Sequence, residues 1–292
     1  MIPARAINVS RRYGDVLALD NLNLDVPAGQ LVGLLGPNGA GKSTLVNLFT
    51  GIRAPSAGTV QLFGGDPRDP VRRRGLGVTP QETGLPPSLR VGEVVDFVRA
   101  HYPDPLGRDE ILGRFGLTDL VKRQTGGLSG GQKRRVAVAL AFAGRPRIVF
   151  LDEPTTGLDV EARRALWNGV RAFHADGGTV VLTSHYLEEI EALAERVVVI
   201  GGGRVLADDT VDAVRGLVAI RRVSLSSRVP LPDLPGVVGT ERDGDRIHLM
   251  TADADRLVRD LVSHDVSFAD LEVRPTSLEE AFLTITHEPV AA

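Results

Sequence analysis

Short apolar segments in the first two thirds of the chain mark the strands of a buried sheet. Residues 31–35, 148–152 and 179–183 are short, mainly apolar runs, which are typical of parallel strands covered on both faces. Residues 6–10 and 22–26 alternate apolar and polar side chains instead, as antiparallel strands with one face in water do. The pattern predicts a parallel central sheet with an antiparallel β subdomain.

Helical segments between these strands place the chain in the α/β class. Residues 91–100, 109–115 and 136–143 have helical patterns, and they lie in a stretch with few β-branched runs and several Pro and Gly breaks. We predict that residues 82–144 form a helical insertion into the α/β core. A further helix is expected over residues 160–173.

The pattern changes near residue 215, which predicts two domains, residues 1–215 and 216–292. Strand-like segments follow the change, and residues 254–262 carry apolar side chains on one helical face. Ser277 and Glu280 have the spacing of a capping box before a last helix. The second domain is therefore expected to be a small α+β accessory domain.

A glycine loop lies between the strand at residues 31–35 and a segment with apolar residues at helical spacing. It fits the pattern G-x-x-x-x-G-K-[ST] of the phosphate-binding P-loop, so the first domain is expected to have a P-loop NTPase core. Glycines allow positive φ and turn backbone N–H groups toward an anion, while Lys42 reaches the β- and γ-phosphates and the Ser43 hydroxyl can ligate Mg²⁺. The predicted phosphate-binding residues are Gly36, Pro37, Asn38, Gly39, Ala40, Gly41, Lys42, Ser43 and Thr44.

A second glycine turn precedes the apolar helix at residues 136–143. By the same physics, a glycine turn that opens a helix is a second anion site. A glycine-rich helix cap without a ligand is the alternative. The residues of this turn are Leu128, Ser129, Gly130, Gly131 and Gln132.

Acidic and histidine side chains follow two of the predicted buried strands. Asp152 and Glu153 end one strand, and His185 follows another. Ligands of open α/β sheets bind beyond the carboxyl ends of the strands, so Asp152 is expected to hold Mg²⁺ and Glu153 to polarise a water for in-line attack. A surface acidic pair and a structural histidine are the alternatives.

The composition is that of an ordinary globular protein. The 292 residues are 42% hydrophobic and 24% charged, and the formal net charge of −3 gives no global basic field that would indicate nucleic acid. The absence of cysteine excludes disulfides and thiolate metal sites. No apolar run approaches the roughly 18 residues of a membrane span, so any membrane role is expected to come through a partner chain.

Three further features have two interpretations each. Tyr13 could stack on a base or could be an ordinary edge-strand tyrosine. The charge runs at residues 72–74 and 133–135 are interpreted as solvated faces rather than ligand sites.

Taken together, the motifs resemble those of the ATP-binding subunits of ABC transporters, over about residues 4–215. The resemblance identifies residues 36–44 as the Walker A loop and residues 128–132 as the signature sequence. It identifies Asp152 as the Walker B aspartate and Glu153 as the catalytic glutamate. The tail of the chain and the single nucleotide domain look most like the type-2 drug and antibiotic exporter ATPases.

The same resemblance assigns roles that the residue patterns alone leave open. It implies that Gln81 is the Q-loop glutamine, that Asp159 belongs to the D-loop of a dimer, that His185 is the switch histidine and that Tyr13 stacks on adenine. The implied catalytic residues are Glu153, His185 and Gln81. The implied Mg²⁺ ligands are Ser43, Gln81 and Asp152.

The resemblance further implies how such a chain works. Two copies pack head to tail with ATP and Mg²⁺ between one Walker A loop and the other signature, hydrolysis separates them, and a separate transmembrane permease holds the pair at the cytoplasmic face of the membrane. We expect a homodimer, export as the direction and no nucleic acid as partner. A non-transport ABC ATPase acting on ribosomes or nucleic acid is the alternative. A plain P-loop kinase or GTPase does not explain residues 128–132.

Overall fold

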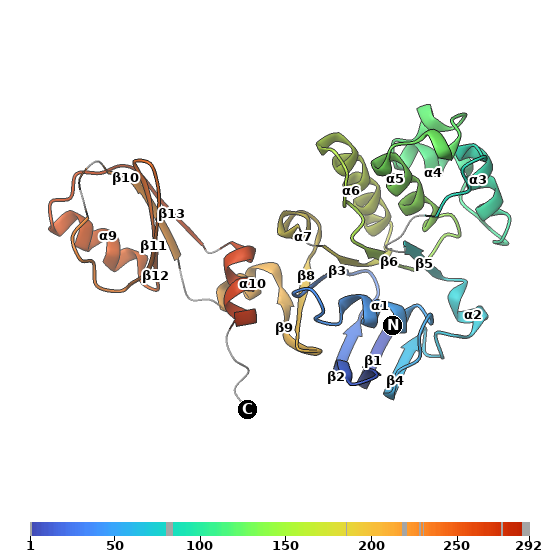
Figure 1. Ribbon diagram of the computed structural model, residues 1–292, viewed down its shortest axis with the longest axis horizontal. Coiled ribbons are helices and arrows are strands. Elements are labelled where there is room, and N and C mark those ends of the chain that lie inside the picture. Colours follow the sequence, from blue (N-terminus) through green and yellow to red (C-terminus); the bar gives the residue numbers. More distant parts are fainter. Residues whose placement is uncertain are drawn as a thin grey trace. The chain divides into compact units, whose positions relative to one another are not determined.

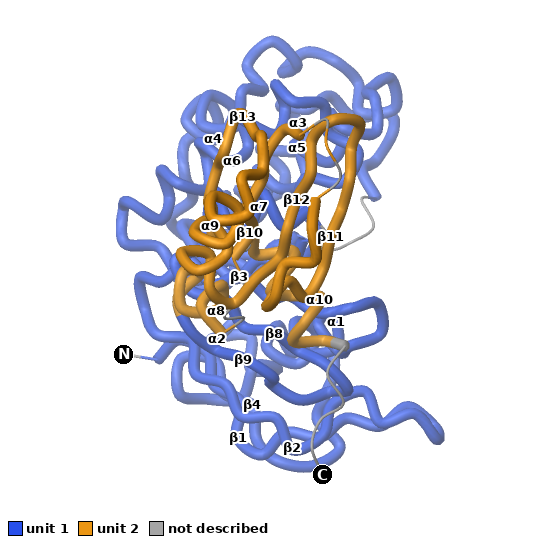
Figure 2. Tube along the Cα trace, turned by 90° about the vertical axis from the view of Figure 1, so that its left-hand side faces the viewer, with its two compact units in different colours: residues 1–209 blue, residues 210–292 orange. Residues whose placement is uncertain are grey.

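The computed structural model divides into two compact units, residues 1–209 and 210–292 (Figures 1 and 2). It describes residues 2–79, 84–184, 186–217, 221–227, 229, 231–275 and 277–287. The division precedes helix α8 (Val211–Leu217), whereas the pattern of the sequence placed it between residues 215 and 216. The difference arises because α8 packs against α10 (Leu278–His287), which belongs to the second unit.

The first unit contains a six-stranded central sheet. In spatial order its strands are β5 (Leu76–Thr79), β6 (Ile148–Asp152), β7 (Thr179–Thr183), β3 (Leu31–Leu35), β8 (Arg196–Gly201) and β9 (Arg204–Thr210). Neighbours from β5 to β8 are parallel, and every residue of β3, β6 and β7 is buried. The predicted parallel core is confirmed, and its parallel strands bring their carboxyl ends to one edge.

An antiparallel sheet lies beside the central sheet, as predicted. Its order is β2 (Val16–Val26), β1 (Ala4–Tyr13) and β4 (Ala57–Leu62). Helix α1 (Lys42–Phe49) contacts both sheets, and one continuous hydrophobic cluster joins them. Within this cluster Phe49 of α1 stacks on Phe150 of β6 with ring centroids 5.6 Å apart. This packing fixes α1, and therefore the loop before it, against the central sheet.

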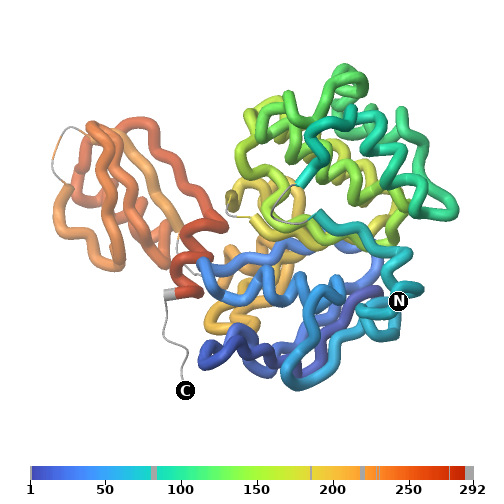
Figure 3. The backbone as a smooth tube through the Cα atoms, turned by 45° about the vertical axis from the view of Figure 1, so that its right-hand side comes forward, coloured from blue at the N-terminus to red at the C-terminus, as the bar shows by residue number. Residues whose placement is uncertain are grey.

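Other helices of the first unit lie on the side of the central sheet opposite α1 (Figure 3). They are α3 (Val91–Arg99), α4 (Arg108–Arg114), α5 (Gly130–Leu140) and α6 (Val160–Ala175). Phe142 contributes to the packing of these helices. Its ring centroid lies 4.8 Å from that of Phe115 and 5.0 Å from that of Phe173. Helix α5 begins earlier than the predicted residues 136–143, since Ser129 caps it. None of the described helices is long and apolar enough to cross a membrane.

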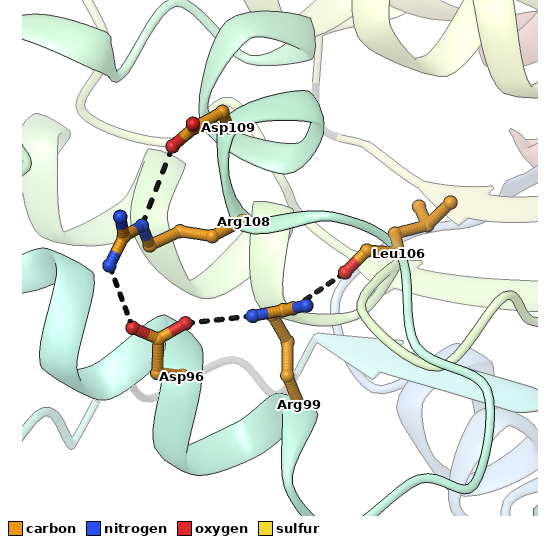
Figure 4. Close-up of polar contacts among 5 residues, drawn as sticks. All are labelled: Asp96, Arg99, Leu106, Arg108 and Asp109. Carbon is orange, nitrogen blue, oxygen red and sulfur yellow. Dashed lines mark hydrogen bonds and ion pairs between the residues drawn. The ribbon is translucent and has the colours of Figure 1, made fainter.

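Asp96 connects α3 to α4 through two arginines (Figure 4). Its carboxylate accepts hydrogen bonds from Arg99 at 2.8 Å and from Arg108 at 2.9 Å. Arg99 also donates to the Leu106 carbonyl at 2.6 Å, and the Asp96 carboxylate raises the pKa of Arg108 above its ordinary value. Exposed ion pairs add little stability, so this network mainly sets the orientation of the two helices.

The second unit is a small α+β fold, in agreement with the sequence pattern. A four-stranded antiparallel sheet has the order β11 (Val237–Asp243), β12 (Arg246–Thr251), β10 (Arg221–Ser226) and β13 (Ala269–Pro275). Helix α9 (Ala254–Ser263) packs on this sheet through Leu257 and Leu261. The sequence pattern did not predict β11 and β13, whose residues are mostly exposed, so no buried apolar run marks them.

We expect a chain that ends at Asp209 to fold without the second unit, because the central sheet and the cluster beneath it lie within residues 1–209. A chain that ends at Gly201 is the matched control. It lacks β9 and the buried Ala207, so its melting temperature should fall well below that of the longer chain. Circular dichroism and thermal melting measure both. A 1–209 chain that melts without a cooperative transition would contradict the division.

Candidate nucleotide-binding site

The glycine loop at residues 36–44 leaves the carboxyl end of β3 and enters α1 directly. Gly39 and Gly41 have φ values of +80° and +105°, a region that favours glycine. A Cβ atom on Gly41 would lie 2.5 Å from the Ala18 carbonyl oxygen, whereas the Cβ position of Gly39 has no atom within 4 Å. Neighbouring atoms therefore pack closely against the loop at Gly41, whereas the space beside Gly39 is open. A loop with one open side at the N-terminus of a helix is the arrangement that phosphate binding requires.

Lys42 begins α1, and its side chain folds back over the loop. The side chain is buried, and Nζ donates hydrogen bonds to the carbonyl oxygens of Gly36 at 2.6 Å and Pro37 at 3.0 Å. Burial lowers the pKa of Lys42, while the negative charges of Glu153 and Asp152 act in the opposite direction. The loop thus holds a cation within electrostatic range of both carboxylates.

The carboxylates lie at the end of β6, where β7 supports them. Asp152 is buried and accepts a hydrogen bond from Thr183 Oγ1 at 2.5 Å. The backbone N–H of Glu153 donates to the same Thr183 Oγ1 at 3.0 Å, and Glu153 has a φ value of +49°. Such a backbone conformation is uncommon for a residue other than glycine, and it turns the chain sharply between the two acidic residues.

Arg134 of α5 also holds this turn. Its Nη2 donates hydrogen bonds to the backbone carbonyls of Asp152 and Glu153. The side chain is buried, and burial lowers the pKa of Arg134. The interpretation of residues 133–135 as a solvated face is therefore wrong for Arg134, because the helix turns this arginine inward.

The second glycine turn forms the N-terminus of α5. Ser129 Oγ accepts from the backbone N–H of Gln132 at 3.2 Å, and Gln132 Oε1 accepts from the backbone N–H of Ser129 at 3.1 Å. These two bonds make a capping box. Leu128 is buried beneath the turn, whereas Ser129 and Gly130 are exposed. The helix N-terminus, with its positive dipole end, is therefore displayed at the surface.

The segment at residues 153–159 connects the carboxylates to helix α6. Asp159 caps α6, since its Oδ1 accepts from the backbone N–H of Ala162 at 2.7 Å. Thr155 is buried within the segment and donates to Glu189 of helix α7 (Leu187–Leu193) at 2.8 Å. The predicted dimer role of Asp159 remains a prediction, and its carboxylate has a structural function within the chain.

Two predicted residues, Gln81 and His185, lie outside the described residues, so their roles stay predictions. Tyr13 is 39% exposed at the end of β1. The guanidinium of Arg11 lies over its ring at 4.5 Å from the centroid. One face of the tyrosine is therefore covered by a cation, and adenine stacking by Tyr13 also stays a prediction.

The residues that support the site were not found from the sequence. They are Arg134, Thr183 and Glu189. Arg134 lies within a run of charges, and Glu189 is one of four glutamates in residues 188–195. Thr183 had the clearest signal, as a polar residue at the end of an apolar strand one position before a serine. Pattern alone does not separate a buried charge from a solvated one.

The donor set fits Mg²⁺ held together with a nucleotide. Among the residues that the structure describes, no group of three or more His, Cys, Asp or Glu side chains could hold a metal by itself. Mg²⁺ is usually bound by one or two carboxylates together with water and substrate phosphates. The Asp152 carboxylate near the Lys42 loop is such a partial site, and the Ser43 hydroxyl at the start of α1 could complete it.

Solved structures share this fold. An ATP-binding subunit of an ABC transporter superposes with a TM-score of 0.67 at 27% identity, covering 74% of this chain and 93% of the other. An ATP-binding cassette in a dimeric post-hydrolysis state with ADP and Pi gives a TM-score of 0.64 at 28% identity, covering 71% and 98%. In both comparisons the matched region is a larger share of the solved chain than of this chain. This difference is consistent with an additional unit in this chain.

Sequence relatives extend over nearly the whole chain. The profile described as "ABC transporter" matches residues 19–156. A daunorubicin resistance ATP-binding protein, DrrA2 of Streptomyces coeruleorubidus, is 37% identical over 97% of this chain and 94% of its own. The Nod factor export ATP-binding protein I of Rhizobium etli is 33% identical over 96% and 92%. With this glycine loop, these carboxylates and this second helix N-terminus, the chain belongs to the ATP-binding proteins of ABC transporters.

Proposed function

We propose that this chain is the ATP-hydrolysing motor subunit of an exporter. The observation that carries the proposal is the Lys42 loop beside the buried end of β6, where Asp152 and Glu153 lie within electrostatic range of the lysine. The names of its relatives support export, because they include drug resistance and Nod factor export proteins. Similarity over nearly the full length favours a shared function rather than a shared domain.

The residues of the loop supply binding and orientation of the triphosphate. Backbone N–H groups of residues 38–44 and the N-terminus of α1 surround the β-phosphate, and Lys42 exchanges its carbonyl partners for phosphate oxygens. Ser43, Asp152 and Gln81 would hold Mg²⁺, which neutralises charge that develops on the phosphates when it is bound. Glu153 accepts the proton of the attacking water.

The second anion site supports a head-to-tail homodimer. Ser129 and Gly130 display a helix N-terminus at the surface, where the γ-phosphate bound by another copy could complete it. A relative at 28% identity has been solved as a dimer with ADP and Pi, which supports pairing in this family. ATP then joins the two copies, and loss of the γ-phosphate removes the charge that holds them.

The partner that uses this motion is a separate membrane permease, which would hold the pair at the cytoplasmic face of the membrane. Full-length similarity to ATP-binding proteins of export systems supports this arrangement. The alternative, an ABC ATPase acting on ribosomes or nucleic acid, finds no support among these relatives. Co-purification with a polytopic membrane protein, against co-sedimentation with ribosomes, separates the two.

Replacement of Lys42 by methionine should weaken ATP binding, because the apolar stem remains and the charge is lost. Hydrogen bonds to charged groups contribute about 1.5–3 kcal/mol, so the dissociation constant should rise roughly 10- to 100-fold. A fluorescent-nucleotide titration measures it. Lys122→Met, at an exposed position, is the control. An unchanged affinity in Lys42→Met would show that this lysine does not contribute to nucleotide binding.

Glu153→Gln should bind Mg·ATP and hydrolyse it slowly, since the amide cannot accept the proton of the attacking water. A general base contributes about 10²- to 10⁴-fold to the rate, and we expect kcat to fall by that range while the dimer accumulates. Phosphate release and size-exclusion chromatography with light scattering measure the two effects. Turnover at the wild-type rate would exclude Glu153 as the base. Exposed Glu161→Gln serves as control.

Ser129→Arg should stop turnover without affecting nucleotide binding by single chains, because the large cation blocks a surface that only a second copy uses. Ser129→Thr keeps the capping hydroxyl and is the matched control. Turnover is measured at saturating Mg·ATP, and binding at chain concentrations where monomers predominate. Loss of binding by Ser129→Arg monomers would contradict a site shared between copies. Hydrolysis restored by mixing Ser129→Arg with Lys42→Met would demonstrate the shared site directly.

A further inference from the structure

Helix α7 carries a glutamate that is fully enclosed by the first unit. The side chain of Glu189 is 0% exposed, and burial raises the pKa of its carboxyl group. A buried carboxyl is costly unless hydrogen bonds compensate for lost water. None of the roles described so far for nucleotide binding or hydrolysis uses Glu189. The hydrogen-bond partners of Glu189 therefore indicate its role.

Three side chains from three different segments donate to this carboxyl. Thr155 Oγ1 donates to Oε2 at 2.8 Å, and the indole Nε1 of Trp167 on α6 donates to Oε1 at 3.1 Å. Ser184, directly after β7, makes a third side-chain hydrogen bond, and the positive charge of Arg163 lies within electrostatic range. Thr155 and Ser184 are themselves buried. The carboxyl thus joins one structural helix to two loops.

The two loops are those that lead to the reacting end of the nucleotide. Thr155 lies two positions after Glu153, and the hydroxyl of its neighbour Thr156 approaches Glu153 Oε2 at 3.5 Å. The same loop ends at Asp159. Ser184 immediately precedes His185 in the sequence. Glu189 is therefore one hydrogen bond from a neighbour of the proposed base and one from the residue that precedes the predicted switch histidine.

We propose that Glu189 is a positioning residue for ATP hydrolysis, which holds the loop of Glu153 and the residue directly after β7 in a common arrangement through Thr155 and Ser184. This inference rests on the proposed role of Glu153. Glu189 does not touch the nucleotide, and it acts only through the two hydroxyls. Its third bond goes to Trp167 within α6. The carboxyl is therefore bonded to one residue of a helix and to two residues of loops.

Glutamine at position 189 can reproduce all three bonds, which gives the test its first pair of variants. Its carbonyl oxygen accepts from the indole of Trp167, and its amide donates to the two hydroxyls, which accept as well as donate. Leucine has a similar volume and makes none of the bonds. We expect Glu189→Gln to keep kcat within about threefold of wild type. Glu189→Leu should lower kcat about 100-fold, since a misplacement near 1 Å has that effect.

The second pair of variants separates positioning from stability. Thr155→Val removes the hydroxyl that leads to the Glu153 loop, and a lost bond to a charged group should lower kcat about 10-fold. Trp167→Phe removes the bond to α6 and leaves both loops bound, so kcat should remain near wild type while the melting temperature falls. Both variants keep the carboxyl and most of the packing, so they remain informative if Glu189→Leu fails to fold.

The assay uses the full chain with saturating Mg·ATP, and it measures phosphate release, nucleotide affinity and melting temperature for each variant. The proposal requires that Glu189→Leu and Thr155→Val lower kcat with unchanged nucleotide affinity. It is overturned if both turn over at the wild-type rate, if Glu189→Gln is as slow as Glu189→Leu, or if Trp167→Phe lowers kcat as much as Thr155→Val.

A matched control and an independent reference complete the design. Glu188→Gln changes the neighbouring exposed glutamate and should alter nothing. A wild-type chain that does not hydrolyse ATP would refute the proposed function itself, and a Glu153→Gln variant as fast as wild type would refute the role of Glu153 on which the inference rests. Normal hydrolysis that depends on Glu153 but not on Glu189 or Thr155 would refute only the positioning role.

Discussion

The nucleotide site depends on the attraction between one buried cation and two carboxylates at the same sheet edge. Lys42 lies at the start of α1, and Asp152 and Glu153 end β6, so the interaction spans two parallel strands separated by β7. In this structure the carbonyl oxygens of Gly36 and Pro37 accept hydrogen bonds from the lysine. Burial without these partners would be too costly for a charge, so the glycine loop must supply hydrogen-bond acceptors for the lysine at this edge.

Support for this edge comes from side chains that are not among the predicted nucleotide-binding residues. Thr183 on β7 binds both Asp152 and the backbone of Glu153, and Arg134 binds the carbonyls of the same two residues. The positive φ of Glu153 is an uncommon conformation that the surroundings must maintain. The two side chains, Thr183 and Arg134, together hold the backbone of this sharp turn.

The fold and the ligand-binding half of the site follow from the sequence, because their physical requirements leave a local pattern. Buried strands such as β3 and β7 need apolar runs, and a phosphate loop needs glycines at fixed spacing. The supporting half does not follow. Arg134 was interpreted as solvated, since the run at 133–135 shows charge but not which residue α5 turns inward. Glu189 depends on Thr155, 34 positions away, and no local pattern records a contact at that separation.

Helix α5 links the surface proposed to meet a second copy with the turn of Asp152 and Glu153, and this suggests how nucleotide between two copies would affect the site within each. Its N-terminus displays Ser129 and Gly130 at the surface, and five residues further on Arg134 grips the backbone of Asp152 and Glu153. A helix of this length is a stiff rod of about 16 Å. A force on the exposed end therefore reaches the hydrolytic carboxylates through a single element, without passing through the sheet. Closure of the dimer and alignment of Glu153 would then be one event rather than two.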